Sequence, residues 1–197
     1  MPNPAPARLV LASTSRYRRE LLARLNIPFE IAAPNVDESS LAGEAPRALA
    51  RRLAGTKARA VQSAWPDALI IGSDQVAVVG DTVLNKPGDF DHATLQLKLM
   101  RGKAVYFFTA LCLLNARTGR EQTILVPVTV HMRNFSDAQI ERYLLAEEPY
   151  DCAGSARIEG LGITLVAKLE GDDPNALIGL PLIALCDMLR EEGVNLP

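Results

Sequence analysis

The chain has 197 residues, of which 48% are hydrophobic and 22% are charged, as is usual for globular proteins. Its 21 basic and 23 acidic side chains give a net charge of -2, which argues against a general binder of nucleic acids or membrane surfaces, because such binders need a basic excess. Disorder is excluded, and a chain of this length buries enough surface to fold without a metal or a disulfide.

The first half of the chain alternates between short apolar runs and helical patterns. The predicted elements are strands at Arg8–Ala12, Phe29–Ala33 and Ala68–Gly72, helices after Ser15 to about Leu25 and from Pro46 to about Trp65, and a hairpin over Val76–Leu84. Ser15 is expected to cap its helix, because its hydroxyl can accept an unpaired backbone N–H. Pro46 suits a first helical turn, and Gly80 with Asp81 favours a hairpin turn.

The second half has longer β runs. The predicted elements are a helix over Asp91–Arg101, strands over Val105–Leu114 and Thr123–Met132, a helix from Ser136 to about Ala146, a glycine-rich β region over Gly154–Leu169 and a last helix from Pro181. In the second strand Val128, Val130 and Met132 share one face, which is typical of a half-exposed antiparallel strand. The sum is an α/β fold, with a mixed sheet and flanking helices in two lobes around a central cleft. We expect residues 1–197 to form a single domain, because no linker is long enough to separate independent ones.

The cysteines and the apolar runs indicate the compartment. Cys112, Cys152 and Cys186 are odd in number and far apart, as expected of reduced thiols that pack as small hydrophobic groups. The first residues lack the pattern of a secretory signal, and no apolar run reaches the roughly 20 residues that span a bilayer. The sequence therefore predicts a soluble cytoplasmic protein that does not bind membranes.

A first polar cluster, residues 13–19, lies between a predicted strand and a predicted helix. Three hydroxyl side chains, three arginines and Tyr17 gather where a helix start offers unpaired N–H groups and a positive dipole, which favour an anion such as phosphate. The alternative is a capped helix with a solvated basic face. Basic residues in a first turn oppose the helix dipole unless an anion compensates them, and this weakens the alternative.

Two further clusters carry carboxylates. Asp74 follows an apolar strand, at a point where open α/β sheets bind ligands, and could hold a divalent cation or take a proton from water; a turn-capping aspartate is the alternative. Glu159 lies among glycines, where an ordinary β-turn is the simpler interpretation. Taken alone, Glu38 and Lys86 would be surface charges. Together, the three clusters combine oxygen ligands for a metal with side chains that can donate hydrogen bonds to phosphate. This combination suits metal-assisted phosphate chemistry.

Six blocks of sequence occur in the order seen in one protein family. They are LVLASTSRYRRELL, PNVDES, IIGSDQV, LNKP, CAGSARIEGLG and IGLPL, and they run from about Arg8 to the C-terminus. With these blocks the chain resembles the Maf family of nucleoside triphosphate pyrophosphatases over nearly its whole length. It is most similar to the 7-methyl-GTP pyrophosphatase branch, because GSDQ replaces the GADT of the dTTP/UTP branch.

The resemblance implies a two-lobed fold related to inosine triphosphate pyrophosphatase, and a homodimer. The implied reaction cleaves a nucleoside triphosphate between its α- and β-phosphates, with a divalent cation (Mg2+, Mn2+ or Co2+), and clears 7-methyl-GTP from the nucleotide pool. Two alternatives stay open: a pyrophosphatase for dTTP, UTP or other triphosphates, and a nucleotide-binding regulator of cell division with slow turnover. Stable binding of nucleic acid is not expected.

The same resemblance implies roles for individual residues. Asp74 would be the general base, and Glu38 would join Asp74 as a metal ligand. The residues that would contact phosphates are Ser13, Arg18, Lys57 and Lys86. The residues that would select the base are Tyr17, Gln75 and Glu159.

Selectivity for a methylated guanine has a physical basis in these residues. Methylation at N7 gives the base a positive charge, which an aromatic face such as that of Tyr17 attracts. Glu159 could accept hydrogen bonds from the N–H donors of the base. The chain has Arg16 and Tyr17 where relatives in this branch often carry Pro and Trp, and tyrosine binds cations more weakly than tryptophan. The alternative for Tyr17 is a place in a core stripe with Leu21 and Leu25.

Overall fold

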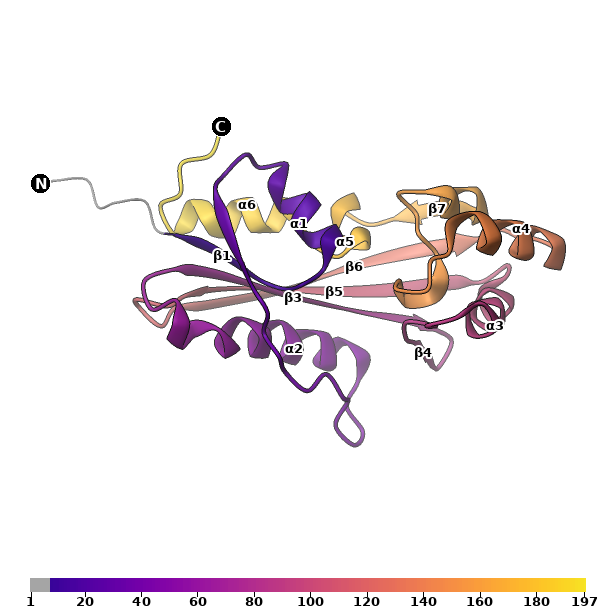
Figure 1. The fold of residues 1–197 in the computed structure, drawn as a ribbon, viewed down its shortest axis with the longest axis horizontal. Helices are drawn as coiled ribbons and strands as arrows, with labels where there is room; N and C mark the ends of the chain where they lie inside the picture. Colours follow the sequence, from indigo (N-terminus) through magenta and orange to yellow (C-terminus); the bar gives the residue numbers. More distant parts are fainter. Residues whose placement is uncertain (1–7) are drawn as a thin grey trace, which may run out of the picture. The chain divides into compact units, whose positions relative to one another are not determined.

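A computed structural model describes residues 8–197 (Figure 1). The chain divides into two compact units. The first unit contains the described residues up to Gln75, together with Thr109–Val126 and Asp173–Pro197. The second unit contains Val76–Phe108 and Pro127–Asp172. That these units are lobes of one domain stays a prediction.

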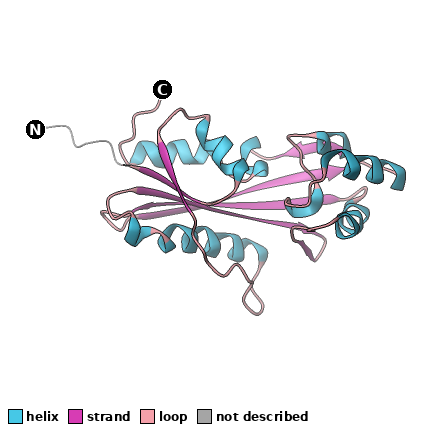
Figure 2. Cartoon of the chain, viewed as in Figure 1, coloured by secondary structure: helices cyan, strands magenta, loops and turns pink. Residues whose placement is uncertain are grey.

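The strands form one seven-stranded mixed sheet, so the predicted α/β class is confirmed (Figure 2). They are β1 (Leu9–Ala12), β2 (Phe29–Ala32), β3 (Leu69–Val79), β4 (Thr82–Leu84), β5 (Ala104–Asn115), β6 (Glu121–Met132) and β7 (Val166–Glu170). The order is β2-β1-β3-β5-β6-β7, with β4 paired to β3. Strand β1 runs parallel to β2 and β3, whereas the β3–β4 and β6–β7 pairs are antiparallel.

The helices begin largely where the capping residues predict. They are α1 (Arg16–Ala23), α2 (Pro46–Ala60), α3 (Phe90–Met100), α4 (Asp137–Glu147), α5 (Pro174–Ile178) and α6 (Leu182–Glu191), with short 3-10 turns η1 (Gln62–Ala64), η2 (Ala153–Ser155) and η3 (Leu161–Leu165). Ser15 accepts the N–H of Arg18, and Ser136 forms a capping box with Gln139, so both predicted caps are confirmed. Within residues 8–197, none of these helices combines the length and apolar character needed to cross a bilayer.

Three predicted boundaries are wrong. The strand expected to end at Gly72 continues to Val79, because β3 is buried along nearly its whole length and pairs with β4 beyond the glycine. The β region expected over Gly154–Leu169 consists mostly of 3-10 turns, with a strand only from Val166, and Gly154 has a φ of 75° that a regular strand excludes. Helix α2 ends at Ala60 and is followed by η1, and the short helix α5 was not predicted.

The core of the first unit lies on one face of its strands. The cluster includes Leu9, Leu11, Leu69, Ile71, Leu111 and Leu113 from the sheet, and Leu21, Leu22, Leu182, Leu185, Met188 and Leu189 from helices α1 and α6. The sheet residues are alternate positions of β1, β3 and β5, as expected when successive side chains point to opposite faces. Helices α1 and α6 cover this face, and α2 covers the other (Figure 1).

The second unit buries the predicted face of β6. Val128, Val130 and Met132 are nearly inaccessible, while the alternating Thr129 and His131 are half-buried. The half-exposed strand predicted from period-2 alternation is therefore confirmed.

The cysteines are free thiols, as predicted. Cys112 lies inside strand β5, and burial raises the pKa of its thiol to about 12. A thiol that stays protonated is a poor nucleophile, so this cysteine packs as a small hydrophobic group.

Candidate active site

Strand β3 carries polar side chains on both of its faces. Asp74 faces helix α2, whereas Ser73 and Gln75 face the segment from α5 to α6, as the alternation of side chains along a strand requires. The parallel pairing of β3 with β1 ends at Ile71, opposite Leu11. Asp74 therefore lies just beyond the carboxyl end of the parallel pair, so the predicted reason for its placement holds although the strand itself continues.

Gly72 lets helix α2 approach strand β3 unusually closely. A Cβ atom at this position would lie 2.1 Å from the carbonyl oxygen of Ala54 and 2.8 Å from the backbone nitrogen of Ala58. Ala50, Ala54 and Ala58 are fully buried and recur every four residues along α2, so the helix presents a face of small side chains to the strand. The close approach brings Lys57, on the same helix, within reach of Asp74.

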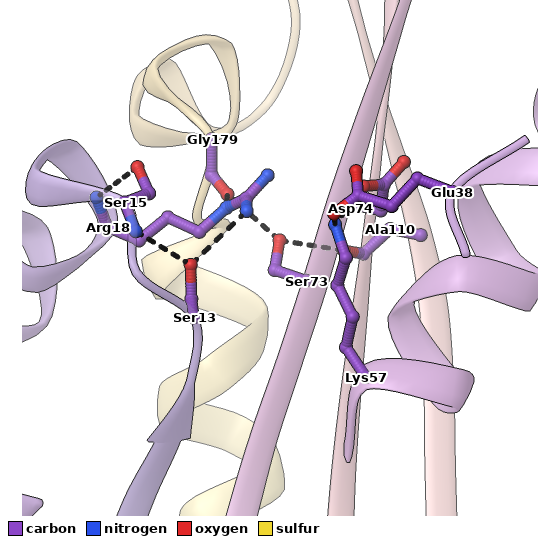
Figure 3. Close-up of polar contacts among 9 residues, drawn as sticks. All are labelled: Ser13, Ser15, Arg18, Glu38, Lys57, Ser73, Asp74, Ala110 and Gly179. Atoms are coloured by element: carbon purple, nitrogen blue, oxygen red, sulfur yellow. Dashed lines mark hydrogen bonds and ion pairs between the residues drawn. The ribbon is translucent and has the colours of Figure 1, made fainter. Parts of the chain in front are cut away.

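Lys57 contacts two carboxylates (Figure 3). Its Nζ lies 2.7 Å from Oδ1 of Asp74 and 3.0 Å from Oε1 of Glu38. Lys57 and Asp74 are 4% and 5% exposed, whereas the side chain of Glu38 is 60% exposed. Glu38 and Asp74, predicted to act together, thus meet at one ammonium group. The role predicted for Lys57, contact with phosphates, stays a prediction.

The charges around Asp74 oppose the effect of its burial. Burial raises the pKa of the Asp74 carboxyl above its ordinary value, while Lys57 and Arg18 act to lower it and Glu38 acts to raise it. A carboxylate with a raised pKa is a better proton acceptor than an ordinary surface aspartate. The role of general base that the sequence predicts for Asp74 stays a prediction, and the direction of this pKa shift agrees with it.

Arg18 reaches from helix α1 toward strand β3 and is fixed at two of its nitrogens (Figure 3). Its Nε donates to the carbonyl oxygen of Gly179 at 2.9 Å, and its Nη1 donates to Oγ of Ser13 at 3.4 Å. Burial lowers the pKa of the guanidinium, and Asp74 and Glu38 act to raise it; an arginine stays charged in either case. Ser13 and Arg18, predicted to bind the same anion, are therefore neighbours.

The carbonyl groups at the end of helix α5 lie within hydrogen-bond distance of side chains from strand β3. Oγ of Ser73 lies 2.9 Å from the carbonyl oxygens of both Ala110 and Gly179. Nε2 of Gln75 donates to Oγ1 of Thr109 and to the carbonyl oxygens of Ala176 and Leu177, at 2.9 to 3.0 Å. Because the amide nitrogen of Gln75 is engaged by the protein, only its side-chain oxygen is left to meet a ligand.

Tyr17 lies at the start of α1 with a cation over its ring. The guanidinium carbon of Arg16 is 4.7 Å from the ring centroid, and Nη2 of Arg16 donates to the Tyr17 hydroxyl at 2.6 Å. Tyr17 is half-buried, whereas Leu21 belongs to the core and Leu25 packs against it. The predicted core stripe thus applies to the two leucines, and Tyr17 presents a ring that already binds a positive charge.

Lys86 and Glu159 belong to the second unit. Lys86 follows strand β4, is exposed and lines a hollow of about 450 Å³ together with His92 and Gln96. Glu159 is exposed in a turn between η2 and η3, as the simpler sequence interpretation predicted, and its carboxylate lies 3.6 Å from Nε of Arg157.

The turn that carries Glu159 is held by helix α4. The Glu147 carboxylate accepts the N–H of Leu161 at 2.7 Å and Nη1 of Arg157 at 2.9 Å, and the Tyr143 hydroxyl accepts the N–H of Arg157 at 2.9 Å. A Cβ at Gly160 would lie 2.5 Å from the Glu147 carboxylate, so a larger residue there would displace this side chain from its contacts. Side chains of α4 thus fix the backbone on both sides of Glu159.

Sequence reasoning missed the residues that support the site. No sequence pattern pointed to Thr109 or Glu147, and Gly72 and Ser73 could be interpreted only as part of the polar cluster around Asp74. One signal for the role of Gly72 was available. The alanines at four-residue intervals along α2 predict a helix face of small side chains, which can pack closely against a strand at a glycine. The partners of Ser73 and Thr109 are backbone carbonyls distant in sequence, and no sequence pattern reveals them.

The site has the ligands for a hard divalent cation, although few of them. Among residues 8–197 no three histidine, cysteine, aspartate or glutamate side chains gather as a metal site. Glu38 and Asp74 supply two carboxylates that meet at Lys57. Mg2+ is commonly bound by one or two carboxylates together with substrate phosphates and water, so the pair fits such a cation with water or phosphates as its other ligands.

Comparison with known proteins places the chain in one family. A family model described as Maf-like protein matches residues 8–192. This chain is also similar to proteins named 7-methyl-GTP pyrophosphatase. Those from Thiobacillus denitrificans, Methylobacillus flagellatus and Nitrosococcus oceani are 60%, 58% and 53% identical to this chain. These alignments cover 95%, 95% and 98% of this chain and 93%, 97% and 97% of the relatives. The resemblance seen in the sequence is therefore confirmed, and the chain belongs to the Maf family.

Proposed function

We propose that this protein is a pyrophosphatase that hydrolyses 7-methyl-GTP to 7-methyl-GMP and pyrophosphate, and so clears a modified nucleotide. The observation that carries the proposal is the acid pair of Asp74 and Glu38 at Lys57, in a chain whose relatives bear this enzyme's name. A protein that only bound nucleotides would not need two carboxylates beside the phosphates, since they repel the ligand.

The reaction needs a water molecule to attack the α-phosphorus while the bond to the β-phosphate oxygen breaks. Asp74 accepts the proton of that water, and pyrophosphate leaves with the bonding electrons. A divalent cation held by Asp74 and Glu38 would neutralise phosphate charge and make a bound water more acidic. No covalent nucleophile is required, because catalysis of phosphoryl transfer is mostly positioning and charge neutralisation.

The triphosphate carries about four negative charges, so its binding needs positively charged side chains and N–H groups that donate hydrogen bonds. We assign this role to Ser13, Arg18 and Lys86, with the start of helix α1 as a further source of N–H groups. Lys57 is assigned to the phosphates as well, while its contacts with Asp74 and Glu38 keep both carboxylates in place. Arg18 suits the role because its guanidinium is charged and held by Ser13 and Gly179.

Base selection is assigned to three side chains. Glu159 would accept hydrogen bonds from the N–H donors of guanine, and Gln75 offers an oxygen because its nitrogen is engaged by the protein. Tyr17 would stack on the positively charged methylated base. Uracil and thymine lack both the charge and the guanine amino group, which is the physical reason to favour a modified purine over dTTP or UTP.

The setting of the enzyme belongs to the same proposal. We assign the enzyme to the cytoplasm and expect it to form a homodimer. We do not expect it to bind nucleic acid or membranes. The near-neutral net charge and the free cysteines support the compartment and the lack of nucleic-acid binding, and the family resemblance is the reason to expect a dimer.

A substrate panel tests the function. The protein is incubated with 7-methyl-GTP, GTP, dTTP or UTP and with Mg2+, Mn2+ or Co2+, and the products are identified by ion-exchange chromatography. We expect 7-methyl-GMP and pyrophosphate in equal amounts, and the highest kcat/KM for 7-methyl-GTP. A preference for dTTP or UTP would assign the other substrate class. Binding of nucleotide without turnover in any combination would favour the slow regulator of cell division.

A further inference from the structure

The loop that carries Glu38 has no helix or strand of its own. Residues 33–45 connect β2 to α2 as coil and turn, and Glu38 within them is exposed. A side chain on such a segment loses its position easily, because few backbone hydrogen bonds hold it. Yet Glu38 lies 3.0 Å from the buried ammonium of Lys57, so something must hold the loop against the helix.

The loop is held by one arginine of helix α2. Nε and Nη2 of Arg52 donate to the two carboxylate oxygens of Glu44, at 2.7 and 2.8 Å, which is the forked pairing that only arginine makes. The same Nη2 donates to the carbonyl oxygen of Ser39 at 2.9 Å. Glu44 in turn accepts the N–H of Leu41 at 3.0 Å. Arg52 therefore holds the backbone directly after Glu38.

Both attachments of the loop come from the same helix. Arg52 holds the backbone at Ser39, and Lys57, further along α2, holds the carboxylate of Glu38. A third contact, from the carboxylate of Asp37 to the N–H of Ser39, shapes the chain locally. We infer that Arg52 and Glu44 are positioning residues that hold Glu38 beside Asp74, so that the two carboxylates can bind one divalent cation. This inference rests on the proposed function, since the cation belongs to that site.

The test uses Mn2+ alone as the probe, with the full chain and no nucleotide. Free Mn2+ is measured by electron paramagnetic resonance, and hydrogen exchange of peptides covering residues 37–44 reports the loop. We expect Arg52→Gln to raise the Kd for Mn2+ about tenfold or more, as is usual when a group that orients a metal ligand is removed. The exchange of the Ser39 and Leu41 amides should become faster.

Matched variants separate positioning from a general loss of charge or stability. Arg51→Gln removes the same charge one residue away, at an exposed arginine that donates to the Thr123 carbonyl at 3.5 Å, and it should leave the Kd unchanged. Arg52→Lys keeps the positive charge but cannot make the forked pairing with Glu44. Its Kd should therefore lie between those of the unaltered protein and Arg52→Gln. Glu44→Gln should weaken binding like Arg52→Gln, and thermal melting shows that each variant is folded.

A double variant decides how Arg52 acts. If it acts through Glu38, then Arg52→Gln added to Glu38→Gln causes no further rise in Kd. An equal rise in both backgrounds, an unchanged Kd or unchanged loop exchange would overturn the inference, as would unfolding of both the Arg52 and Glu44 variants. The proposed function fails separately, if the unaltered enzyme turns over no triphosphate.

Discussion

Asp74 and Glu159, to which we assign the chemistry and the selection of the base, are held in different ways. Asp74 lies within a buried strand of the first unit, and its carboxylate is bonded to the equally buried Lys57. Glu159 lies on an exposed turn of the second unit, and side chains of helix α4 fix the backbone around it. On this assignment, the proposed base is held by the sheet, whereas the side chain proposed to select the substrate is held by a few side-chain contacts with helix α4.

Removal of the Asp74 carboxylate should have the largest effect. Asp74→Asn keeps an oxygen for Lys57, so we expect the fold to persist while kcat falls about a hundred- to ten-thousandfold, because a general base is lost. Turnover of 7-methyl-GTP and circular dichroism check both expectations. The control is Asp67→Asn, an exposed aspartate shortly before the same strand, which should leave kcat unchanged. Retained activity in Asp74→Asn would remove this residue as the base.

A wider gap between strand β3 and helix α2 should have the next effect. Gly72→Ala places a methyl group against the Ala54 carbonyl, so we expect a loss of about 1–3 kcal/mol in the free energy of unfolding and a lower kcat, since Lys57 moves away from Asp74. Urea unfolding and steady-state kinetics measure the two quantities. Gly55→Ala on α2 is the matched control, because its methyl group meets only the ends of Arg59 and Glu121 side chains. Equal stability losses in the two variants would contradict the close-approach argument.

The selectivity region should respond to a change that leaves the chemistry intact. Glu159→Gln removes a charged acceptor, so we expect kcat/KM for 7-methyl-GTP to fall about tenfold, with a smaller change for UTP. The ratio of the two kcat/KM values is the measurement. Glu148→Gln removes a neighbouring exposed carboxylate and should not change this ratio. If both substrates lose equally in Glu159→Gln, this side chain does not select the base.

The smallest effect is expected at the ring of Tyr17. Arg16 places a guanidinium over that ring, where it competes with and repels a positively charged base. We therefore expect Arg16→Gln to raise the preference for 7-methyl-GTP over GTP about two- to fivefold, as the removal of an exposed cation–π contact allows. Arg19→Gln removes an equal charge from the same helix and serves as the control. A reduced preference would mean that Arg16 assists the substrate.

Most elements of the fold could be predicted from the sequence because their signals are local. Ser15 and Ser136 cap helices through hydrogen bonds within three residues, and Gly80 turns a hairpin with a φ of 57°. The turns around Glu159 lie inside a segment predicted as a β region, and that prediction failed because the turns depend on Glu147 and Tyr143 from another element. The glycines and β-branched residues of this segment form a pattern typical of a strand, and only the contacts with helix α4 show that it forms turns.

The candidate site could be predicted as a set of residues but not as a set of contacts. The ordered sequence blocks brought Ser13, Arg18, Glu38 and Asp74 together through family resemblance, and the structure places these four near one another in the first unit. Nothing in the sequence indicated that Lys57 would be buried beside two acids, because a lysine in an amphipathic helix is usually solvated. Nor could it show that Arg52 holds the Glu38 loop.

The ammonium of Lys57 gives the acid pair a counter-charge that belongs to the chain itself. Two carboxylates drawn together with nothing between them would repel, and the fold would then depend on the supply of an ion, as it does in zinc fingers. With Lys57 in place, we expect the chain to fold without a metal ion. A chelator should accordingly stop turnover while the melting temperature stays the same.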